Sequence, residues 1–385
     1  LHLSIRRQRQ MCIRDRLLLL VAMFAFIGNI NAQVWNMVVT HNDGTVQIIK
    51  ASDVKNVTFQ LPDQNADQVI IKELYTTGVP DDKDPKKFFQ SDKGFILYNN
   101  GGKTAVISNL AIGMLDPYNA HSAANAWYSA GATEPSYVSQ NWVPATAGIW
   151  YFQNSLVIEP YSQVVICCMG AIDNTKTYSK SINYANKDYY TMYDPESGYN
   201  NTSYYPTPSN VIPTSQYLKA VNFGPANAWP LSQSSPAFFI FQTKGTTPAA
   251  FAKDASNITY APGKAKTNVN AVLKVPTDWI LDGVEVYQDI NESKSKKRFG
   301  SDVDAGYVKQ TIKLGHSVYR NVDVEATKKI EGNTAKLVYN YKYGTDPSGI
   351  DAEASMKKGA KIVYMDTNNS TSDFHERKQF SLRDK

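Results

Sequence analysis

The sequence predicts an all-β protein whose short strands pack as a β-sandwich. Segments 69–78, 94–100 and 104–115 are rich in β-branched and aromatic residues and are separated by Gly- and Asn-containing turns. Segments 140–152 and 155–170 continue the pattern, with Pro and Gly at their turns. No long amphipathic helical pattern separates these segments, so we expect a sandwich rather than a parallel α/β sheet.

The N-terminal region predicts export. Residues 7–16, RQRQMCIRDR, resemble a translated sequencing adapter, and we interpret residues 1–16 as an artefact. Residues 17–27 are apolar but too few for a membrane-spanning helix, which needs about 20 residues. With the small residue Ala32 as a cleavage position, residues 17–32 fit a signal peptide. We therefore expect a protein of the periplasm or cell surface, without a transmembrane span after cleavage.

The charge balance argues against nucleic acid or an anionic membrane surface as a partner. The chain holds 40 basic and 35 acidic residues, and residues 1–32 contribute five Arg and one Asp to these totals. The remaining chain has 35 basic and 34 acidic residues, a net charge of +1. Such a chain lacks the basic excess that attracts polyanions over long range.

Known catalytic and metal-binding patterns are missing from the sequence, so we expect no enzyme activity, metal or cofactor. There is no nucleophile elbow, zinc-protease helix or phosphate-binding loop. The acidic loop 81–92 lacks the spacing of a calcium-binding loop and contains interleaved Lys residues, which favours a solvated loop. Cys167 and Cys168 should point to opposite faces of a strand as thiols, with a vicinal disulfide as the alternative.

Residues 33–60 predict a β-hairpin appendage. Asn42, Asp43 and Gly44 tolerate the positive φ of a tight turn, and β-branched residues flank them. The segment resembles a short N-terminal module common on secreted proteins of the Bacteroidota. A polar linker, residues 60–68, separates it from a domain that we assign to residues 69–385.

Several short motifs of this domain resemble a known family. They are FILYNN and GIWYF among the early strands, then DWILDGVEV (278–286), KKRFGSDVDAGYV (296–308), GHSVYR (315–320) and DTNNSTSDF (366–374). Together they resemble lamin-tail-like domains and, more closely, the secreted Bacteroidota family named domain of unknown function 4876 (DUF4876). The resemblance implies a lamin-tail or immunoglobulin-like sandwich, and it brings no established activity.

The resemblance also implies a structural ion pair near the C-terminus. Arg followed later by Asp-Thr-Asn recurs at the end of lamin-tail-like domains. We therefore expect Arg320 to form a partly buried, bidentate pair with Asp366 or Asp373, in a network that includes Asn368. This network should lock the final strands together.

Two segments differ in composition from the strands and are interpreted as insertions. Residues 324–360 should be peripheral, and residues 174–236 should form a long excursion at one end of the sandwich. The excursion contains the candidate ligand-binding residues Tyr189, Tyr190, Tyr193, Tyr204, Tyr205 and Trp229. Their rings suit glycan or protein recognition, and the alternative is that they pack the excursion onto the domain.

The sequence thus favours a non-catalytic binding protein that recognises a glycan or a cell-envelope protein. One alternative is a hydrolase whose carboxylates converge from separate loops, with Asp188, Asp194 and Glu196 as contributors. Another is a structural subunit of the cell surface, which exposed strand edges would support.

Overall fold

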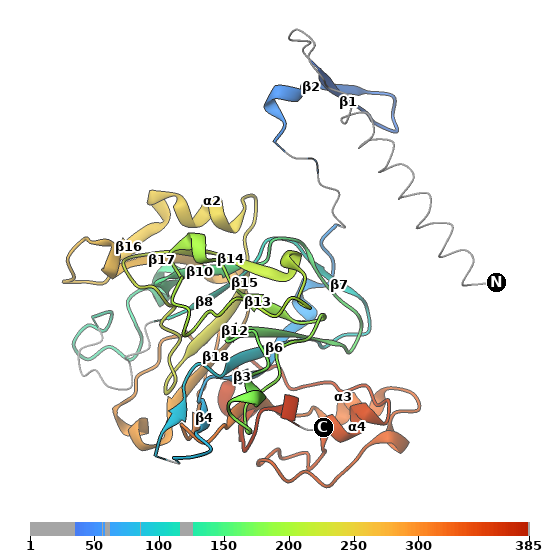
Figure 1. Cartoon of the computed structure of the whole chain (residues 1–385), viewed down its shortest axis with the longest axis vertical. Coiled ribbons are helices and arrows are strands. Elements are labelled where there is room, and N and C mark those ends of the chain that lie inside the picture. The colour runs from blue at the N-terminus through green and yellow to red at the C-terminus, as the bar shows by residue number, and fades with distance from the viewer. Residues whose placement is uncertain (1–34, 56, 58–61, 85, 116–125, 384–385) are drawn as a thin grey trace. The chain divides into compact units, whose positions relative to one another are not determined.

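The structure is a computed structural model, shown in Figure 1, and it describes residues 35–55, 57, 62–84, 86–115 and 126–383. The chain divides into two compact units, Leu1–Phe59 and Gln60–Lys385. The predicted adapter segment and signal peptide lie outside the described residues.

The described part of the first unit is an antiparallel hairpin of β1 (Asn36–Thr40) and β2 (Val46–Lys50). Gly44 has a φ of 85°, and its N–H donates to the carbonyl of His41 at 2.9 Å. The carboxylate of Asp43 accepts from the backbone N–H of Thr45 at 2.9 Å. The turn therefore forms at the residues that tolerate it.

A twelve-stranded mixed sheet dominates the second unit. Its hydrogen-bonded order is β19 (Val308–Gln310), β18 (Ile280–Gln288), β15 (Ala237–Gln242), β8 (Leu110–Met114), β10 (Gly148–Tyr151), β14 (Tyr217–Asn222), β13 (Tyr190–Met192), β12 (Gln163–Met169), β6 (Lys93–Asn99), β3 (Val69–Tyr75), β20 (Ser317–Arg320) and β21 (Phe374–Arg377). Strands β19 and β21, at the two ends of this order, also contact each other. The sheet therefore bends round until its ends meet.

The excursion at residues 174–236 is part of this sheet, unlike the sequence prediction. Its strands β13 and β14 lie between β12 and β10, and β12, β13 and β14 pair in parallel. Both strands are short, and the Tyr, Asn and Pro residues around them conceal the pattern. The excursion thus joins two halves of the sheet and is not a peripheral loop at one end.

Strands β12, β6 and β3 run side by side (Figure 1). All residues of β3 and β6 and most of those of β12 are buried, on both faces of the sheet. Ile71, Leu97 and Cys168 contribute to one apolar cluster, whereas Ile96 and Cys167 contribute to another. Successive side chains of a strand point to opposite faces, so burial of both faces requires continuous apolar runs. This explains why these strands dominate the sequence pattern.

Smaller elements cover the main sheet. The minor sheets pair β11 (Leu156–Ile158) with β7 (Ala105–Ile107), β4 (Val79–Pro80) with β5 (Phe88–Phe89), and β17 (Ala271–Pro276) with β16 (Ile258–Tyr260) and β9 (Trp142–Thr146). Described α-helices include α2 (Pro248–Lys253), α3 (Val324–Lys329), α4 (Ala352–Lys357) and α5 (Ser370–Asp373). The segment that carries α3 and α4 buries Ile362 and Tyr364 against Tyr98 and Tyr319 of the sheet.

The all-β class predicted from the sequence is confirmed. Three predicted segments each divide into two strands that join different sheets: 104–115 gives β7 and β8, 140–152 gives β9 and β10, and 155–170 gives β11 and β12. The breaks fall where Asn109, Ala147 and Tyr161 adopt positive φ values of 54°, 58° and 54°. The lamin-tail or immunoglobulin-like sandwich stays a prediction. The structure shows one long sheet that bends until its ends meet, whereas a sandwich consists of two packed sheets.

Candidate functional site

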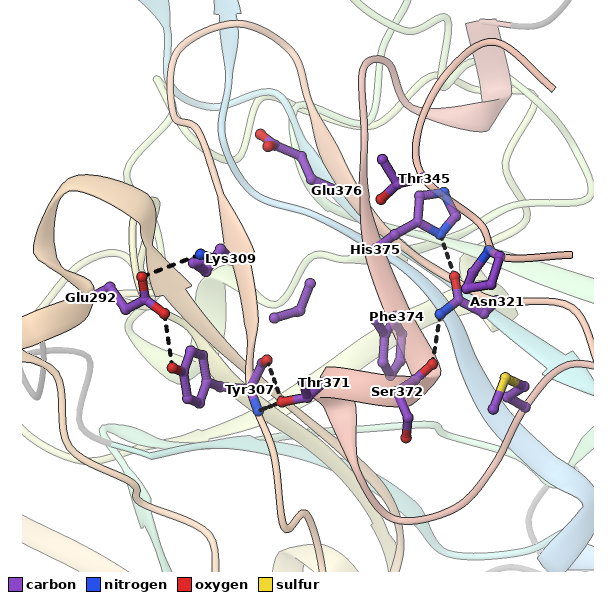
Figure 2. A pocket seen from close by; sticks show the side chains of 13 residues that line it. Glu292, Tyr307, Lys309, Asn321, Thr345, Thr371, Ser372, Phe374, His375 and Glu376 are labelled. Carbon is purple, nitrogen blue, oxygen red and sulfur yellow. Dashed lines mark hydrogen bonds and ion pairs between the residues drawn. The ribbon is translucent and has the colours of Figure 1, made fainter. Parts of the chain in front are cut away.

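A cleft of about 750 Å³ opens where the two ends of the sheet meet, beside β19 and β21. Its volume is in the range typical of small-molecule sites. Figure 2 shows the lining side chains, which come from six separate stretches of the second unit. They are Glu292, Tyr307, Val308, Lys309, Asn321, Thr345, Pro347, Met365, Thr371, Ser372, Phe374, His375 and Glu376.

His375, on β21, is held neutral and in one tautomer. The carboxamide nitrogen of Asn321 donates to the carbonyl of Ser372 at 2.6 Å, so its oxygen faces His375 Nδ1, 2.7 Å away (Figure 2). An amide oxygen only accepts, so Nδ1 must carry the proton, and Nε2 accepts from the hydroxyl of Tyr341. Burial and the nearby Arg377 lower the pKa of His375 to about 3. Both ring nitrogens are therefore occupied.

The two carboxylates of the cleft are also paired. Glu376 accepts from the backbone N–H of Thr311 at 2.6 Å and lies 2.8 Å from His316 Nδ1. Burial acts to raise the pKa of Glu376, but the hydrogen bonds from His316 and Thr311 outweigh it and lower the pKa. Since Thr311 directly follows β19, this contact fastens one end of the sheet to β21.

Glu292 belongs to a second polar group on the opposite wall. It accepts from the hydroxyl of Tyr307 at 2.8 Å and pairs with Lys309 at 3.2 Å (Figure 2). The hydrogen bond from Tyr307 and then that from Lys309 lower the pKa of Glu292. The ring of Tyr307 stacks on Tyr287 with centroids 4.1 Å apart, so its orientation is fixed. This wall offers ionised and hydroxyl groups on a rigid support.

The predicted ion-pair network around Arg320 lies behind the cleft and is larger than expected. Arg320 is 1% exposed, and its guanidinium lies 3.2 Å from Asp366 and 3.7 Å from Asp373. Its shortest ion pair is to Asp282 on β18, which the sequence reasoning missed. The guanidinium also stacks on Phe374, 4.5 Å from the ring centroid. The pair with Asp366 was predicted, but the expected bidentate geometry is wrong, because only one guanidinium nitrogen contacts each of Asp366 and Asp373. Arg320 links four segments rather than the final strands alone.

Asp373 and Asn368 shape the loop before β21. The Asp373 carboxylate accepts from the backbone N–H and the hydroxyl of Thr367, both at 2.7 Å. Asn368 has a φ of 53°, and its carbonyl accepts from the N–H of Ala305 at 2.7 Å. These bonds hold the loop that carries Thr371 and the cleft wall.

The aromatic residues of the excursion are mostly part of the core. Two of the six candidates are buried: Tyr205 is 4% exposed and Trp229 is 1% exposed. The other four are partly buried, namely Tyr189, Tyr190, Tyr193 and Tyr204. The Tyr205 hydroxyl accepts from the backbone N–H of Trp229 at 3.1 Å, and both rings join the main apolar cluster. Tyr205 and Trp229 thus pack the excursion onto the sheet and present no open ring face.

The three carboxylates proposed for a hydrolase do not contact one another in the part of the chain that the structure describes. Asp194 is buried, lies 3.0 Å from Lys219 and accepts from the backbone N–H of Ala220 at 3.0 Å. Asp188 is exposed in a turn, and Glu196 is exposed in the short 3-10 helix Pro195–Ser197. Asp194 therefore holds β14 in place.

The acidic loop and the two cysteines singled out in the sequence are held by contacts within the fold. Asp82 accepts from the N–H and hydroxyl of Ser179, both at 2.7 Å, while buried Asp92 accepts from the Tyr75 hydroxyl at 2.6 Å. Cys167 and Cys168 are buried free thiols on opposite faces of β12. Among the described residues, the helices are too short or too polar to cross a membrane.

Comparisons with known proteins support the family assignment. The model of the family described as "Protein of unknown function (DUF4876)" matches residues 159–340. The predicted DUF4876 family is confirmed for this segment. A crystal structure of a DUF4876 family protein from Bacteroides thetaiotaomicron is similar, with a TM-score of 0.57 and 17% sequence identity. The match covers 93% of this chain and 86% of that chain.

At this identity, the DUF4876 structure shows a shared fold and carries no activity to this chain. A comparison with curated proteins finds no significant match. The lamin-tail relationship is not confirmed by these comparisons. The function must therefore be argued from the geometry of the chain itself.

Sequence reasoning missed the cleft. Its walls come from residues near 292, 307, 321, 345, 365 and 371, which no short motif connects. Tyr307 and Thr371 do fall within the motifs KKRFGSDVDAGYV and DTNNSTSDF, and the Thr371 hydroxyl donates to the carbonyl of Tyr307 at 3.0 Å. The family motifs were thus the available signal, although nothing in them indicates a cavity.

Proposed function

We propose that this DUF4876 protein is a non-catalytic, exported binding protein that recognises a glycan in the cleft between β19 and β21. One observation carries the proposal. Every ionisable side chain that lines the cleft is already paired within the protein: Glu292 with Lys309, and Glu376 with His316. These pairs fix the positions of the groups, and their remaining lone pairs and N–H groups can bind hydroxyls.

The lining suits sugar hydroxyls. Thr345, Thr371 and Ser372 are exposed at the cleft. The Thr345 hydroxyl can both donate and accept, whereas the hydroxyls of Thr371 and Ser372 also bond to the carbonyls of Tyr307 and Asn369. Tyr307 is fixed by its stacking on Tyr287, so a sugar that contacts it costs little side-chain entropy. Polar groups on rigid strands and one aromatic wall are a common arrangement for ligand recognition.

Neutral His375 also fits binding better than catalysis. Its Nδ1 proton points to Asn321 and its Nε2 faces Tyr341, so neither nitrogen is directed at a substrate. With a pKa near 3, it carries no charge across the physiological range. Export to the periplasm or cell surface rests on the apolar segment 17–27 and the cleavage position that follows it.

A glycan array probed with the full-length protein tests the proposal. Two variants are compared with the unmodified chain: Lys309→Ala, which alters the cleft, and Tyr204→Ala, which alters the excursion. Lys309 is exposed and Tyr204 is partly buried, so both variants should fold, which circular dichroism checks. We expect glycan binding that weakens at least tenfold in Lys309→Ala and is unchanged in Tyr204→Ala.

Two results would overturn this assignment. Binding that is lost only in Tyr204→Ala would move recognition to the Tyr-rich excursion. Failure of the folded, unmodified protein to retain any glycan, with capture of an envelope protein instead, would replace a glycan ligand by a protein partner.

A further inference from the structure

Lys72 occupies an unusual position in the main sheet. The pairing of β3 with β6 shifts register between Ile71 and Glu73, so Lys72 lies at a β-bulge. A bulge re-aims a side chain, and here the ammonium lies 5.4 Å from the ring centroid of Tyr319. The Lys72 side chain is 0% exposed. An amine is thus buried where the C-terminal segment covers the sheet.

Two reactive partners flank the Lys72 amine. Its Nζ lies 2.6 Å from the side-chain oxygen of Gln163 on β12 and 2.5 Å from a carboxylate oxygen of Glu353 on α4. Because a C=O bond is about 1.2 Å long, the carboxamide carbon of Gln163 is within about 4 Å of Nζ. The amine therefore has an electrophilic carbon on one side and a base on the other.

The base is oriented by the surrounding aromatic residues. Glu353 also accepts from the Tyr319 hydroxyl at 2.8 Å, and the hydroxyls of Tyr319 and Tyr364 lie 2.9 Å apart. Burial acts to raise the pKa of Glu353, but the ammonium of Lys72 and these hydrogen bonds outweigh it and lower the pKa. Glu353 is thus an ionised carboxylate, and its oxygen lies 2.5 Å from the Lys72 amine in a site that excludes most water, so the geometry allows direct proton transfer between them.

The ion pair between Lys72 and Glu353 does not by itself require the Gln163 carboxamide as a third partner. A buried Lys–Glu pair is satisfied by carbonyls or hydroxyls that accept its remaining protons. Here the third position is a primary carboxamide, held by a neighbouring region of the sheet against the same amine. Fixed proximity of this kind makes slow intramolecular reactions effective, because no encounter of the reactants is needed.

We propose that Lys72 and Gln163 form an intramolecular isopeptide bond, with Glu353 as the proton carrier. Glu353 takes a proton from the Lys72 ammonium, and the free amine attacks the side-chain carbonyl carbon of Gln163. Glu353 passes its proton to the Gln163 nitrogen and takes a proton from Nζ as the C–N bond to the leaving group breaks. Ammonia leaves and carries away the last proton as ammonium. No oxidant, metal or other reactant is required.

The bond would link β3 to β12 across β6, which lies between them in the sheet. A covalent tie between strands 91 positions apart in the sequence restricts the unfolded chain, as a disulfide does, but does not depend on redox conditions. Such a link suits a protein exposed outside the cytoplasm. This inference does not depend on the cleft or its ligand.

Peptide mapping of the purified full-length protein tests the bond. After proteolysis, we expect a cross-linked peptide that contains both Lys72 and Gln163, with a mass lower by one ammonia than its two components. Trypsin should also fail to cleave after Lys72. Mapping by peptide is independent of how the N-terminus is processed.

Two variants provide matched controls. Gln163→Ala removes the electrophile at a partly exposed position, and Glu353→Gln removes the base with little change of shape. Both should yield the two separate peptides, and circular dichroism checks that they fold. Uncross-linked peptides from the folded, unmodified protein would overturn the proposal. Ammonia loss that persists in Glu353→Gln would overturn the role of Glu353, and loss that persists in Gln163→Ala would refute the linkage.

Discussion

Replacing Arg320 by Met removes a buried cation that faces the carboxylates of Asp282, Asp366 and Asp373. Methionine keeps much of the side-chain length but cannot pair with a carboxylate or donate to the carbonyl of Ile71, which now accepts from Nε at 2.9 Å. Asp282 suffers most, because it is buried and forms the shortest ion pair with Arg320, whereas buried Asp373 keeps its hydrogen bonds from Thr367. The change therefore leaves a buried charge without its main partner.

The expected loss follows from that uncompensated charge. Removing one partner of a buried ion pair costs about 3–5 kcal/mol of unfolding free energy. Burial already raises the pKa of Asp282 to about 7, although Arg320 opposes this. Without Arg320 the pKa rises further, so Asp282 can escape the penalty by taking up a proton. The loss should be largest near pH 8 and fall to about 1–3 kcal/mol near pH 5, from the unpaired carbonyl acceptors.

Urea unfolding followed by circular dichroism, at both pH values, measures these losses. In Arg320→Met/Asp282→Asn the charge of Asp282 is absent, so the double variant should lose less at pH 8 than Arg320→Met alone. Lys309→Met serves as the control, because its pair with Glu292 is exposed and contributes about 0–1 kcal/mol. A loss below about 1 kcal/mol at pH 8 for Arg320→Met, or one that grows toward low pH, would refute this reasoning.

Three further predictions concern the core. Burial raises the pKa of Glu73 from its ordinary value of 4.5 to about 7, so its contribution to stability is full below about pH 4.5 and is lost as the pH rises to about 7. Glu73→Gln should therefore flatten the decline in the free energy of unfolding, measured with urea, between about pH 4.5 and pH 7. Trp229→Ala should lower the unfolding free energy by about 3–5 kcal/mol, well beyond Tyr204→Ala, since Trp229 is in the core. Burial raises the pKa of the Cys167 thiol and raises that of Cys168 to about 12. Neither thiol should therefore react with a thiol reagent until urea unfolds the chain. Rapid labelling of the folded protein would contradict this prediction.

The sequence by itself determined the elements with strong local signals. Residues 69–75, 93–99 and 163–169 are strands because their continuous apolar runs need burial on both faces. The turn at Gly44 follows from the positive φ that glycine adopts without strain. The motif around Asp366 correctly indicated an ion pair with Arg320, because family resemblance joined two segments that are distant in sequence.

Only the tertiary structure decided which strands are neighbours and which polar groups meet. Asp282 was hidden in an apolar strand motif, yet it is the closest ionic partner of Arg320. Residues 190–192 and 217–222 were read as part of an excursion, although they fill the middle of the sheet. Lys72 gave no signal until a bulge and the fold brought it to Gln163 and Glu353.

The physical reason is the range of the interactions involved. Strand and turn preferences depend on a few adjacent residues, so they can be recognised along the chain. Strand pairing, burial of a charge and the closure of a cleft depend on contacts between residues tens to hundreds of positions apart. Those contacts exist only once the sheet has folded back and its ends have met.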